Sequence, residues 1–251
     1  MKRIAICLAT YNGQEFIQEQ VRSIIPQLNP GDCLFCSDDG STDQTVNIMS
    51  IYDEIKIVNL KRCGGVVKNF NLLLNYVWKS EDKFDYVVLC DQDDVWLPNR
   101  LEIIRASLQH VDCVQLNGLV VDKNLDTKIS TIFELYPPSA GVLLNLIKNS
   151  HIGCCLAFRS ELLDVALPLP RYTPWHDWYI GLIAQMFFRV GQSSLITIHY
   201  RRHSNNASPT GSISHHSLWK KFGQRVLMIN CLLIALYRRL KLYLQGKGGF
   251  L

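Results

Sequence analysis

The sequence has no apolar run long enough to cross a lipid bilayer. Its longest nearly uninterrupted apolar stretch covers residues 226–237 and is broken by Asn230, whereas a membrane-spanning helix needs about 20 apolar residues. The N-terminus passes directly into a strand-like run, without the apolar segment and cleavage site of a secretory signal. Integral membrane classes are therefore excluded, and we expect a chain that stays in the cytoplasm.

Glycine and proline are scarce, with 15 and 9 residues among 251, and neither an internal repeat nor a low-complexity tract is present. These absences exclude fibrous and disordered chains. The sequence has instead 48% hydrophobic and 19% charged residues, the composition of a packed globular protein. Its length suits one large α/β domain or two small ones.

Zinc-binding and disulfide patterns are also missing, although the chain has nine cysteines. Their number is odd, and most lie inside apolar runs, where a reduced cysteine behaves as a small hydrophobic residue. Cys33 and Cys36 have the spacing of half a zinc site, but no second pair or suitably placed histidine follows. We therefore expect structural cysteines in a reducing compartment.

Acidic residues are absent from the C-terminal part of the chain. Residues 178–251 hold ten Lys and Arg and no Asp or Glu, while residues 1–177 hold 16 Lys and Arg against 22 Asp and Glu, a net charge of −6. Such an asymmetry predicts an acidic partner for the C-terminal part. Membrane headgroups, a phosphorylated lipid and nucleic acid are the candidates.

Strand-like and helix-like segments alternate over the first 120 residues. Strands are predicted at 3–9, 33–37, 55–60 and 85–90, and helices at 15–28, 45–52, 67–79 and after Leu97, with Pro98 in the first turn. Nearly continuous apolar strands that alternate with helices are typical of an α/β fold with a doubly wound, mostly parallel sheet. Such sheets bind ligands at the carboxyl edge of their strands.

The pattern loosens after residue 112. Strands are predicted at 114–121, 154–158 and 194–200, and helices at 140–148, 177–188 and 217–244. We therefore divide the chain into a domain over residues 1–206, with halves 1–112 and 113–206, and a basic, apolar helical tail over residues 207–251.

Carboxylates gather at the ends of three predicted segments. These are Asp38 and Asp39 after the second strand, Asp91, Asp93 and Asp94 after the fourth, and Asp177 at a helix start. Carboxylates this close repel one another unless a cation or N–H donors compensate them. The spacing favours a hard divalent ion shared with substrate phosphates, or else a solvated acidic turn with Asp94 capping the next helix.

Four motifs resemble, in order and spacing, those of family 2 glycosyltransferases. They are ATYNG at 9–13, SDDGSTD at 37–43, GVVKNF at 65–70 and DQDDVW at 91–96. They look closest to bacterial rhamnosyltransferase-like enzymes of surface polysaccharide assembly, such as O-antigen or capsule. The resemblance covers residues 3–110 with isolated islands at 176–178 and 200–206, and it implies the GT-A fold.

This resemblance implies an inverting, metal-dependent transfer from a dTDP- or UDP-linked sugar bound by residues 1–112. Positive charge must stabilise the departing diphosphate, so Asp93 is expected to hold Mg²⁺ or Mn²⁺, with Asp91 near the ion or the ribose. The expected contacts to the nucleotide sugar are Thr10, Asn12, Asp38, Asp39, Asn69, Asp91, Arg201 and His203. A plain turn explains Asn12 and Asn69 equally well, and Arg201 and His203 either close over the diphosphate or belong to the basic surface.

The acceptor hydroxyl needs a base, and the resemblance places Asp177 in that role. The alternative is a helix N-cap worth roughly 0.5–2 kcal/mol. His176 and Trp178 are the expected acceptor contacts in the half formed by residues 113–206, or else His176 simply packs in the core.

The predicted helix at 217–244 has cationic ends and an apolar middle, which is typical of a helix on a membrane surface. We expect it on the inner face of the cytoplasmic membrane, where the resemblance implies a saccharide acceptor on a polyprenyl diphosphate. No nucleic acid partner is expected. The alternative is a helix packed on the domain or against a second copy in a homodimer.

Two other functions fit parts of the sequence. A sugar nucleotidyltransferase also uses acidic metal ligands on a nucleotide-binding sheet, but its glycine-rich N-terminal loop is missing where ATYNG stands. A catalytically inactive, membrane-associated scaffold would not need to retain Asp39, Asp91, Asp93 and Asp177 together. A transferase is therefore the better prediction.

Overall fold

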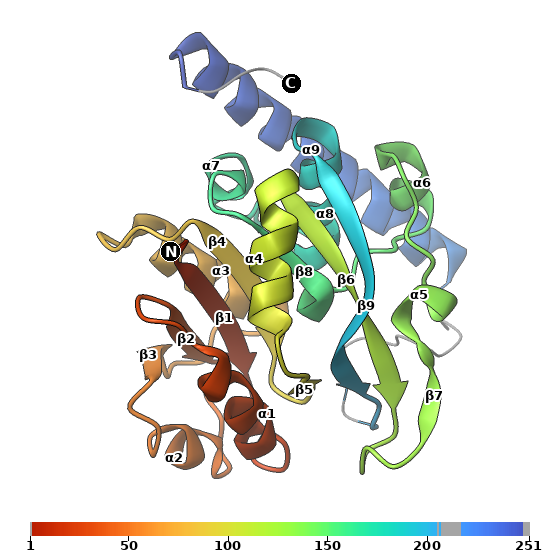
Figure 1. The fold of residues 1–251 in the computed structure, drawn as a ribbon. Helices are drawn as coiled ribbons and strands as arrows, with labels where there is room; N and C mark the ends of the chain where they lie inside the picture. The colour runs from red at the N-terminus through yellow and green to blue at the C-terminus, as the bar shows by residue number, and fades with distance from the viewer. Residues whose placement is uncertain (1, 205, 207–216, 248–251) are drawn as a thin grey trace.

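Nine strands form one sheet with helices on both of its faces (Figure 1). The computed structural model describes residues 2–204, 206 and 217–247. The strands are β1 (Ile4–Thr10), β2 (Cys33–Asp38), β3 (Ile55–Asn59), β4 (Tyr86–Asp91), β5 (Val95–Trp96), β6 (Cys113–Val121), β7 (Lys128–Thr131), β8 (Leu156–Arg159) and β9 (Val190–Arg201). The helices are α1 (Ile17–Ile24), α2 (Thr45–Met49), α3 (Val66–Lys79), α4 (Arg100–His110), α5 (Ile132–Leu135), α6 (Val142–Ile147), α7 (Leu162–Ala166), α8 (His176–Phe187) and α9 (Leu218–Leu244).

The strand order is β3-β2-β1-β4-β8-β6-β9-β5, and β7 pairs with β6. The first four strands of this order are parallel, as predicted for the N-terminal half. Their register aligns Thr10 with Asp38 and Ala9 with Asp91. The carboxyl ends of β1, β2 and β4 therefore meet at one edge, which places the acidic loops together.

Alternate side chains of the central strands supply two separate cores. Ala5 and Cys7 of β1 face a core shared with α3, α7, α8 and α9. Ile4 and Ile6 face a second core, which is shared with α1 and α4. Because both faces of the sheet are covered, the strands read as continuous apolar runs rather than alternating ones.

The second half of the sheet is mixed. β8 is antiparallel to both β4 and β6, whereas β9 runs parallel to β6 and antiparallel to β5. The sheet is thus continuous across the predicted boundary at residue 112. Residues 207–216 and 248–251 of the predicted tail lie outside the described residues, and the division of the chain stays a prediction.

Four short elements were not predicted from the sequence, namely β5, β7, α5 and α7. Each of them has at most five residues and shows no clear apolar periodicity. The strand predicted at 154–158 starts as a 3₁₀ turn over Gly153–Cys155 and becomes β8 only at Leu156. Pro98 lies before α4 rather than in its first turn, since Asn99 precedes the helix with a φ of 66°.

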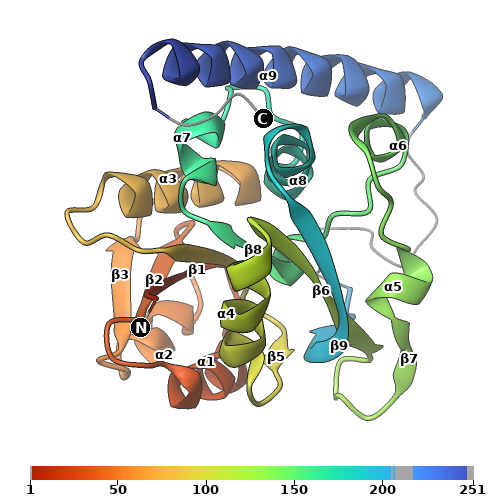
Figure 2. The same ribbon diagram turned by 45° about the horizontal axis from the view of Figure 1, so that its top comes forward.

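The C-terminal helix α9 lies across α7 and α8 (Figure 2). The helix predicted at 217–244 is confirmed, and Ser217 caps it by accepting a hydrogen bond from the Lys220 N–H at 3.3 Å. Met228, Cys231 and Ala235 recur at helical spacing and are buried against the domain. Among the described residues, no helix combines the length and the apolar character needed to cross a membrane.

Candidate active site

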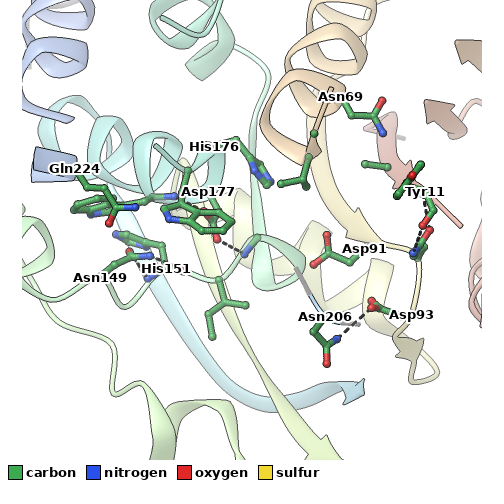
Figure 3. A pocket seen from close by; sticks show the side chains of 18 of the residues that line it. Tyr11, Asn69, Asp91, Asp93, Asn149, His151, His176, Asp177, Asn206 and Gln224 are labelled. Atoms are coloured by element: carbon green, nitrogen blue, oxygen red, sulfur yellow. Dashed lines mark hydrogen bonds between the residues drawn. The ribbon is translucent and has the colours of Figure 1, made fainter. Parts of the chain in front are cut away.

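A cavity of about 830 Å³ lies at the carboxyl edge of the sheet and extends towards α6, α8 and α9 (Figure 3). Eight of the twelve predicted site residues line it, namely Thr10, Asp39, Asn69, Asp91, Asp93, His176, Asp177 and Trp178. The other four, Asn12, Asp38, Arg201 and His203, are not part of its lining. Motifs that are distant in the sequence therefore meet around one cavity.

The end of β4 and the loop after it bring two carboxylates to the cavity. Asp91 and Asp93 lie on the same side of it in Figure 3. Burial and the charges of Asp94, Asp93 and Asp177 raise the pKa of Asp91 well above its usual range. Burial, followed by the charge of Asp93, also raises the pKa of Asp94. These carboxylates thus lack the positive charge that would stabilise their ionised forms.

Residues in and around this loop fit a divalent cation. Asp91, Asp94 and the thiol of Cys154 hold ligand atoms within 4.8 Å of one another. The Oδ2 of Asp94 is buried and has no hydrogen-bond partner in the described part of the chain. Mg²⁺ and Mn²⁺ prefer carboxylate and phosphate oxygens to a thiol. Asp91 and Asp93, which open onto the cavity, are therefore better suited to such an ion than Cys154.

Asp93 is fixed by residues that follow β9. The Nε2 of His203 lies 2.9 Å from the Asp93 Oδ2, and the Nδ2 of Asn206 donates to the same oxygen at 3.2 Å. The His203 ring also stacks on Phe16, with 4.5 Å between ring centroids. His203 thus positions Asp93, and its predicted contact with the donor is not supported by its place outside the cavity lining.

Arg201 braces the acidic loop. Its guanidinium donates to the carbonyls of Asp93 at 2.9 Å and Lys123 at 2.6 Å, and it pairs with Glu19. Its backbone N–H donates to the Asp94 carboxylate at 3.2 Å. The prediction that Arg201 closes over the donor diphosphate is not supported, because the side chain is buried in these contacts.

Asp38 and Asn12 hold loops together at the edge of the sheet. The buried Asp38 carboxylate accepts hydrogen bonds from the Thr10 hydroxyl at 2.8 Å and from the Ser41 N–H and hydroxyl, both at 2.6 Å. The Asn12 Oδ1 accepts from the Thr42 N–H at 2.9 Å. Direct nucleotide contact is therefore not supported for Asp38 or Asn12, whereas Thr10 does line the cavity.

Asp39 fixes the glycine turn before α3. Its carboxylate accepts from the N–H groups of Cys63, Gly64 and Gly65, the last two at 2.8 and 2.7 Å. Gly64 and Gly65 have φ values of 89° and 119°, which glycine adopts without a steric penalty. The turn is thereby held as part of the cavity wall.

Asn69 joins α3 to the two strands beside it. Its Nδ2 donates to the carbonyls of Ser37 at 2.8 Å and Thr10 at 3.3 Å, and its Oδ1 accepts from the Ser37 hydroxyl at 2.5 Å. The side chain is almost fully buried, so it supports the floor of the cavity and offers little surface to a ligand.

Asp177 comes from the opposite wall, in the first turn of α8. Its Oδ1 accepts from the Trp178 N–H at 2.8 Å and its Oδ2 from the Gly153 N–H at 3.2 Å. The N-cap of α8 is Trp175, so Asp177 does not occupy the capping position. Its carboxylate points into the cavity on the wall facing Asp91 (Figure 3).

His176 and Trp178 both pack and line the cavity. The His176 ring stacks on Phe70 of α3, with 4.0 Å between ring centroids. Burial lowers the pKa of His176, so the ring is uncharged at neutral pH. The Trp178 Nε1 donates to the Asn145 carbonyl at 2.9 Å. Packing and contact with a ligand are thus compatible for these two side chains.

Several residues of the cavity have no sequence motif that identifies them. They are His151, Lys148 directly after α6, and the cations Lys221 and Arg225 on α9. His151 is buried, and burial lowers its pKa to about 4. Asn206 also lines the cavity. It lies in the island at 200–206, where only Arg201 and His203 were predicted as site residues. The spacing of these residues in the chain does not reveal that they meet.

The family described as Glycosyl transferase family 2 matches residues 5–166 of the chain. The dTDP-rhamnosyl transferase RfbG of Shigella flexneri is 27% identical over 252 residues, which cover 86% of this chain and 78% of RfbG. The UDP-Glc:alpha-D-GlcNAc-diphosphoundecaprenol beta-1,3-glucosyltransferase WfgD of Escherichia coli is 24% identical over 186 residues, covering 71% of this chain and 68% of WfgD.

Solved structures share the fold. S. aureus TarS 1–349 in complex with UDP-GlcNAc superimposes with a TM-score of 0.69 at 19% identity, covering 95% of this chain and 70% of TarS 1–349. In a second structure of TarS 1–349, the match spans 60% of the length of TarS 1–349. Glucosyl-3-phosphoglycerate synthase from Mycobacterium tuberculosis, in complex with Mn²⁺, UDP and phosphoglyceric acid, superimposes with a TM-score of 0.55 at 20% identity. The match covers 93% of this chain and 78% of the synthase. The predicted GT-A fold is confirmed.

Proposed function

Since this chain belongs to glycosyl transferase family 2 and is therefore a glycosyltransferase, we propose that it transfers one sugar from a dTDP- or UDP-linked donor to a lipid-linked saccharide in bacterial surface polysaccharide synthesis. The observation that carries this proposal is the convergence of Asp39, Asp91, Asp93 and Asp177 on one cavity. The names of RfbG and WfgD supply the donor and acceptor classes. They make dTDP-rhamnose the first donor to test.

The two walls of the cavity have different tasks in the proposed reaction. Asp91 and Asp93 are the residues that would hold Mg²⁺ or Mn²⁺ beside the donor diphosphate. Such an ion supplies positive charge to the leaving group. Asp177 accepts the proton of the acceptor hydroxyl, with its carboxylate oriented by the N–H groups of Trp178 and Gly153. A single displacement assisted by this base inverts the anomeric configuration.

We also propose that α9 lies on the inner face of the cytoplasmic membrane. One face of the helix is packed on the domain, while large apolar side chains such as Leu233 and Tyr237 are exposed on another. Lys220 and Lys241 lie near its two ends, where cations approach anionic headgroups. This arrangement is compatible with both alternatives for the helix, because one face packs on the domain and the other is free to contact lipid. A homodimer stays a prediction.

Asp177→Asn tests the assignment of the base. We expect turnover to fall by about 10²- to 10⁴-fold, while stabilisation of the protein by donor and Mn²⁺ is retained, because the change removes the base and keeps the shape. Transfer to a synthetic isoprenyl diphosphate saccharide and thermal unfolding with dTDP-rhamnose, UDP-glucose and UDP-GlcNAc are the measurements. Asp126→Asn, which changes an exposed carboxylate outside the cavity lining, is the matched control.

Full turnover of Asp177→Asn would remove this residue as the base. A wild-type protein that gains no thermal stability from any of these nucleotide sugars with Mn²⁺ or Mg²⁺ would contradict the donor site itself. That second result would favour an inactive scaffold.

A further inference from the structure

The cavity carries most of its carboxylates at the edge of the sheet and three of its four Lys and Arg side chains at the opposite end, while the fourth, Arg62, precedes the glycine turn that Asp39 holds. The end of β4 and the loop after it contribute Asp91 and Asp93, whereas Lys148, directly after α6, and Lys221 and Arg225 of α9 line the other end. None of these three cations has a carboxylate within ion-pairing distance among residues 2–204, 206 and 217–247. The cationic end therefore has charge available for an anionic ligand.

The proposed base separates the two ends. In Figure 3, Asp177 lies between the Asp91 side of the cavity and the α9 side, which Gln224 marks. A donor diphosphate at the acidic loop would place its sugar towards Asp177. The α9 side then faces the other reactant, so its cations meet the acceptor rather than the donor.

Arg225 joins the two helices that form this end. Its guanidinium donates to the carbonyl of Ile147, the last residue of α6, and to the carbonyl of Lys221 at 2.7 Å. These contacts fix the first turns of α9 against α6. Lys148 and Lys221 are thereby held on the same rim of the cavity.

The cations are flanked by exposed apolar side chains on the same two helices. On α6, Leu143 and Ile147 are 75% and 66% exposed, and on α9, Trp219 and Phe222 are 84% and 61% exposed. Ile147 precedes Lys148 in the chain, and Phe222 follows Lys221. Figure 2 shows α6 beside the start of α9. Soluble proteins rarely expose such apolar groups together without a binding role.

We propose that Lys148, Lys221 and Arg225 bind the diphosphate of an isoprenoid diphosphate embedded in a bilayer, while the apolar side chains of α6 and α9 enter the lipid beside it. This inference rests on the proposed function and assigns the acceptor site of the same cavity. Lysine ammonium and arginine guanidinium groups form charge-assisted hydrogen bonds with phosphate oxygens. The apolar rim keeps the isoprenoid chain in the membrane, and the saccharide beyond the diphosphate extends towards Asp177.

The test compares two double variants that each remove two lysines. Lys148→Ala with Lys221→Ala removes two of the three cations of the cavity rim. Lys220→Ala with Lys241→Ala removes two exposed charges of α9 that do not line the cavity. Binding is measured by sedimentation with phosphatidylcholine vesicles that carry geranylgeranyl diphosphate. A second set carries phosphatidylglycerol at the same total charge, and thermal unfolding with dTDP-rhamnose and Mn²⁺ is recorded for every variant.

We expect the rim variant to bind geranylgeranyl diphosphate vesicles about tenfold more weakly, or worse, than the control variant. The rim variant should bind phosphatidylglycerol vesicles at least as well as the control variant, which lacks the headgroup cations Lys220 and Lys241, and both variants should keep the stabilisation by donor. Equal binding of the two variants to the diphosphate vesicles would overturn the site and leave only general electrostatic attraction. Loss of donor stabilisation in the rim variant would overturn it by assigning the cations to the donor. A wild-type protein that binds these vesicles selectively but gains nothing from any nucleotide sugar would contradict the proposed function alone.

Discussion

Asp93 shows how a single carboxylate depends on distant parts of the chain. It follows β4, yet His203 and Asn206 hold its Oδ2 from beyond the end of β9. Asp93 opens onto the cavity. A cation bound there would depend on the negative charge of the carboxylate, whereas the hydrogen bonds from His203 and Asn206 depend on its shape.

Asp93→Asn separates these two properties, since the amide keeps the shape and can still accept a hydrogen bond. We expect affinity for donor in the presence of Mn²⁺ to fall by at least about 100-fold, as loss of even an outer-shell partner of a metal costs 10- to 100-fold. Isothermal titration with dTDP or UDP, with and without Mn²⁺, measures the loss. Asp53→Asn, which changes an exposed carboxylate distant from Asp93 in the sequence, is the control. Unchanged metal-dependent affinity in Asp93→Asn would show that Asp93 is not a metal ligand.

His151 makes the stability of the fold depend on pH. Burial lowers its pKa from 6.5 to about 4, so the unfolded chain binds a proton between these values that the folded protein does not. The free energy of unfolding therefore falls as the pH drops from about 6.5 to about 4, by at most about 3 kcal/mol for this one group. Gly181 packs closely on the ring, since a Cβ at that position would lie 2.3 Å from it.

His151→Phe keeps a ring and removes the titrating nitrogens. We expect a smaller drop in melting temperature between pH 7 and pH 4.5 than in the wild type, while His176, whose pKa is also lowered by burial, retains part of the drop. Calorimetry at several pH values measures the difference. Identical pH profiles for variant and wild type would rule out His151 as the source.

The sequence predicted which carboxylates line the cavity better than it predicted the role of each one. Motif position identified Asp39, Asp91, Asp93 and Asp177, and all four line the cavity. It could not show that Arg201 is consumed by internal hydrogen bonds, because its partners Glu19 and Lys123 lie far away in the chain.

Among the elements, α9 has two faces with different tasks. Met228 is fully buried against the domain, whereas Leu233 is 57% exposed and Tyr237 67% exposed. The periodicity of the sequence predicted the helix and its ends. It could not separate packing from membrane contact, since both faces are apolar.

Two variants of α9 should therefore respond oppositely. Met228→Ala is expected to lower the free energy of unfolding by about 2–5 kcal/mol, through the cavity that it leaves. Leu233→Ala with Tyr237→Ala should change unfolding by only about 0.5 kcal/mol per site but weaken sedimentation with phosphatidylglycerol vesicles about tenfold, because less apolar surface enters the lipid. Unchanged vesicle binding of the second variant would remove this face from the membrane surface.

Elements with a clear apolar period were predicted well, and the elements that were missed are all short. The helix at 67–79 and the strand at 33–37 have enough apolar residues to reveal their periods, and they match α3 and β2 within one residue. α7 has five residues and β5 two, so their structure depends on neighbours that only the folded chain supplies, such as the pairing of Val95 with His199.

For the whole molecule, the parallel half could be predicted from its repeated strand–helix pattern, but the mixed half could not. β6 pairs with β7, β8 and β9, and two of these three pairs are antiparallel. Pairing over such distances along the chain is set by packing on both cores rather than by any local pattern. The cationic rim made by α6 and α9 is hidden from the sequence for the same reason.

The contact between the end of β9 and α1 also determines when the acidic loop can fold during synthesis. Arg201 pairs with Glu19 and holds the carbonyl of Asp93, 108 positions earlier. A nascent chain that has emerged only as far as α4 presents the three repelling carboxylates Asp91, Asp93 and Asp94 without this brace. The acidic loop therefore gains its full set of contacts only after β9 has left the ribosome, late in the synthesis of the chain.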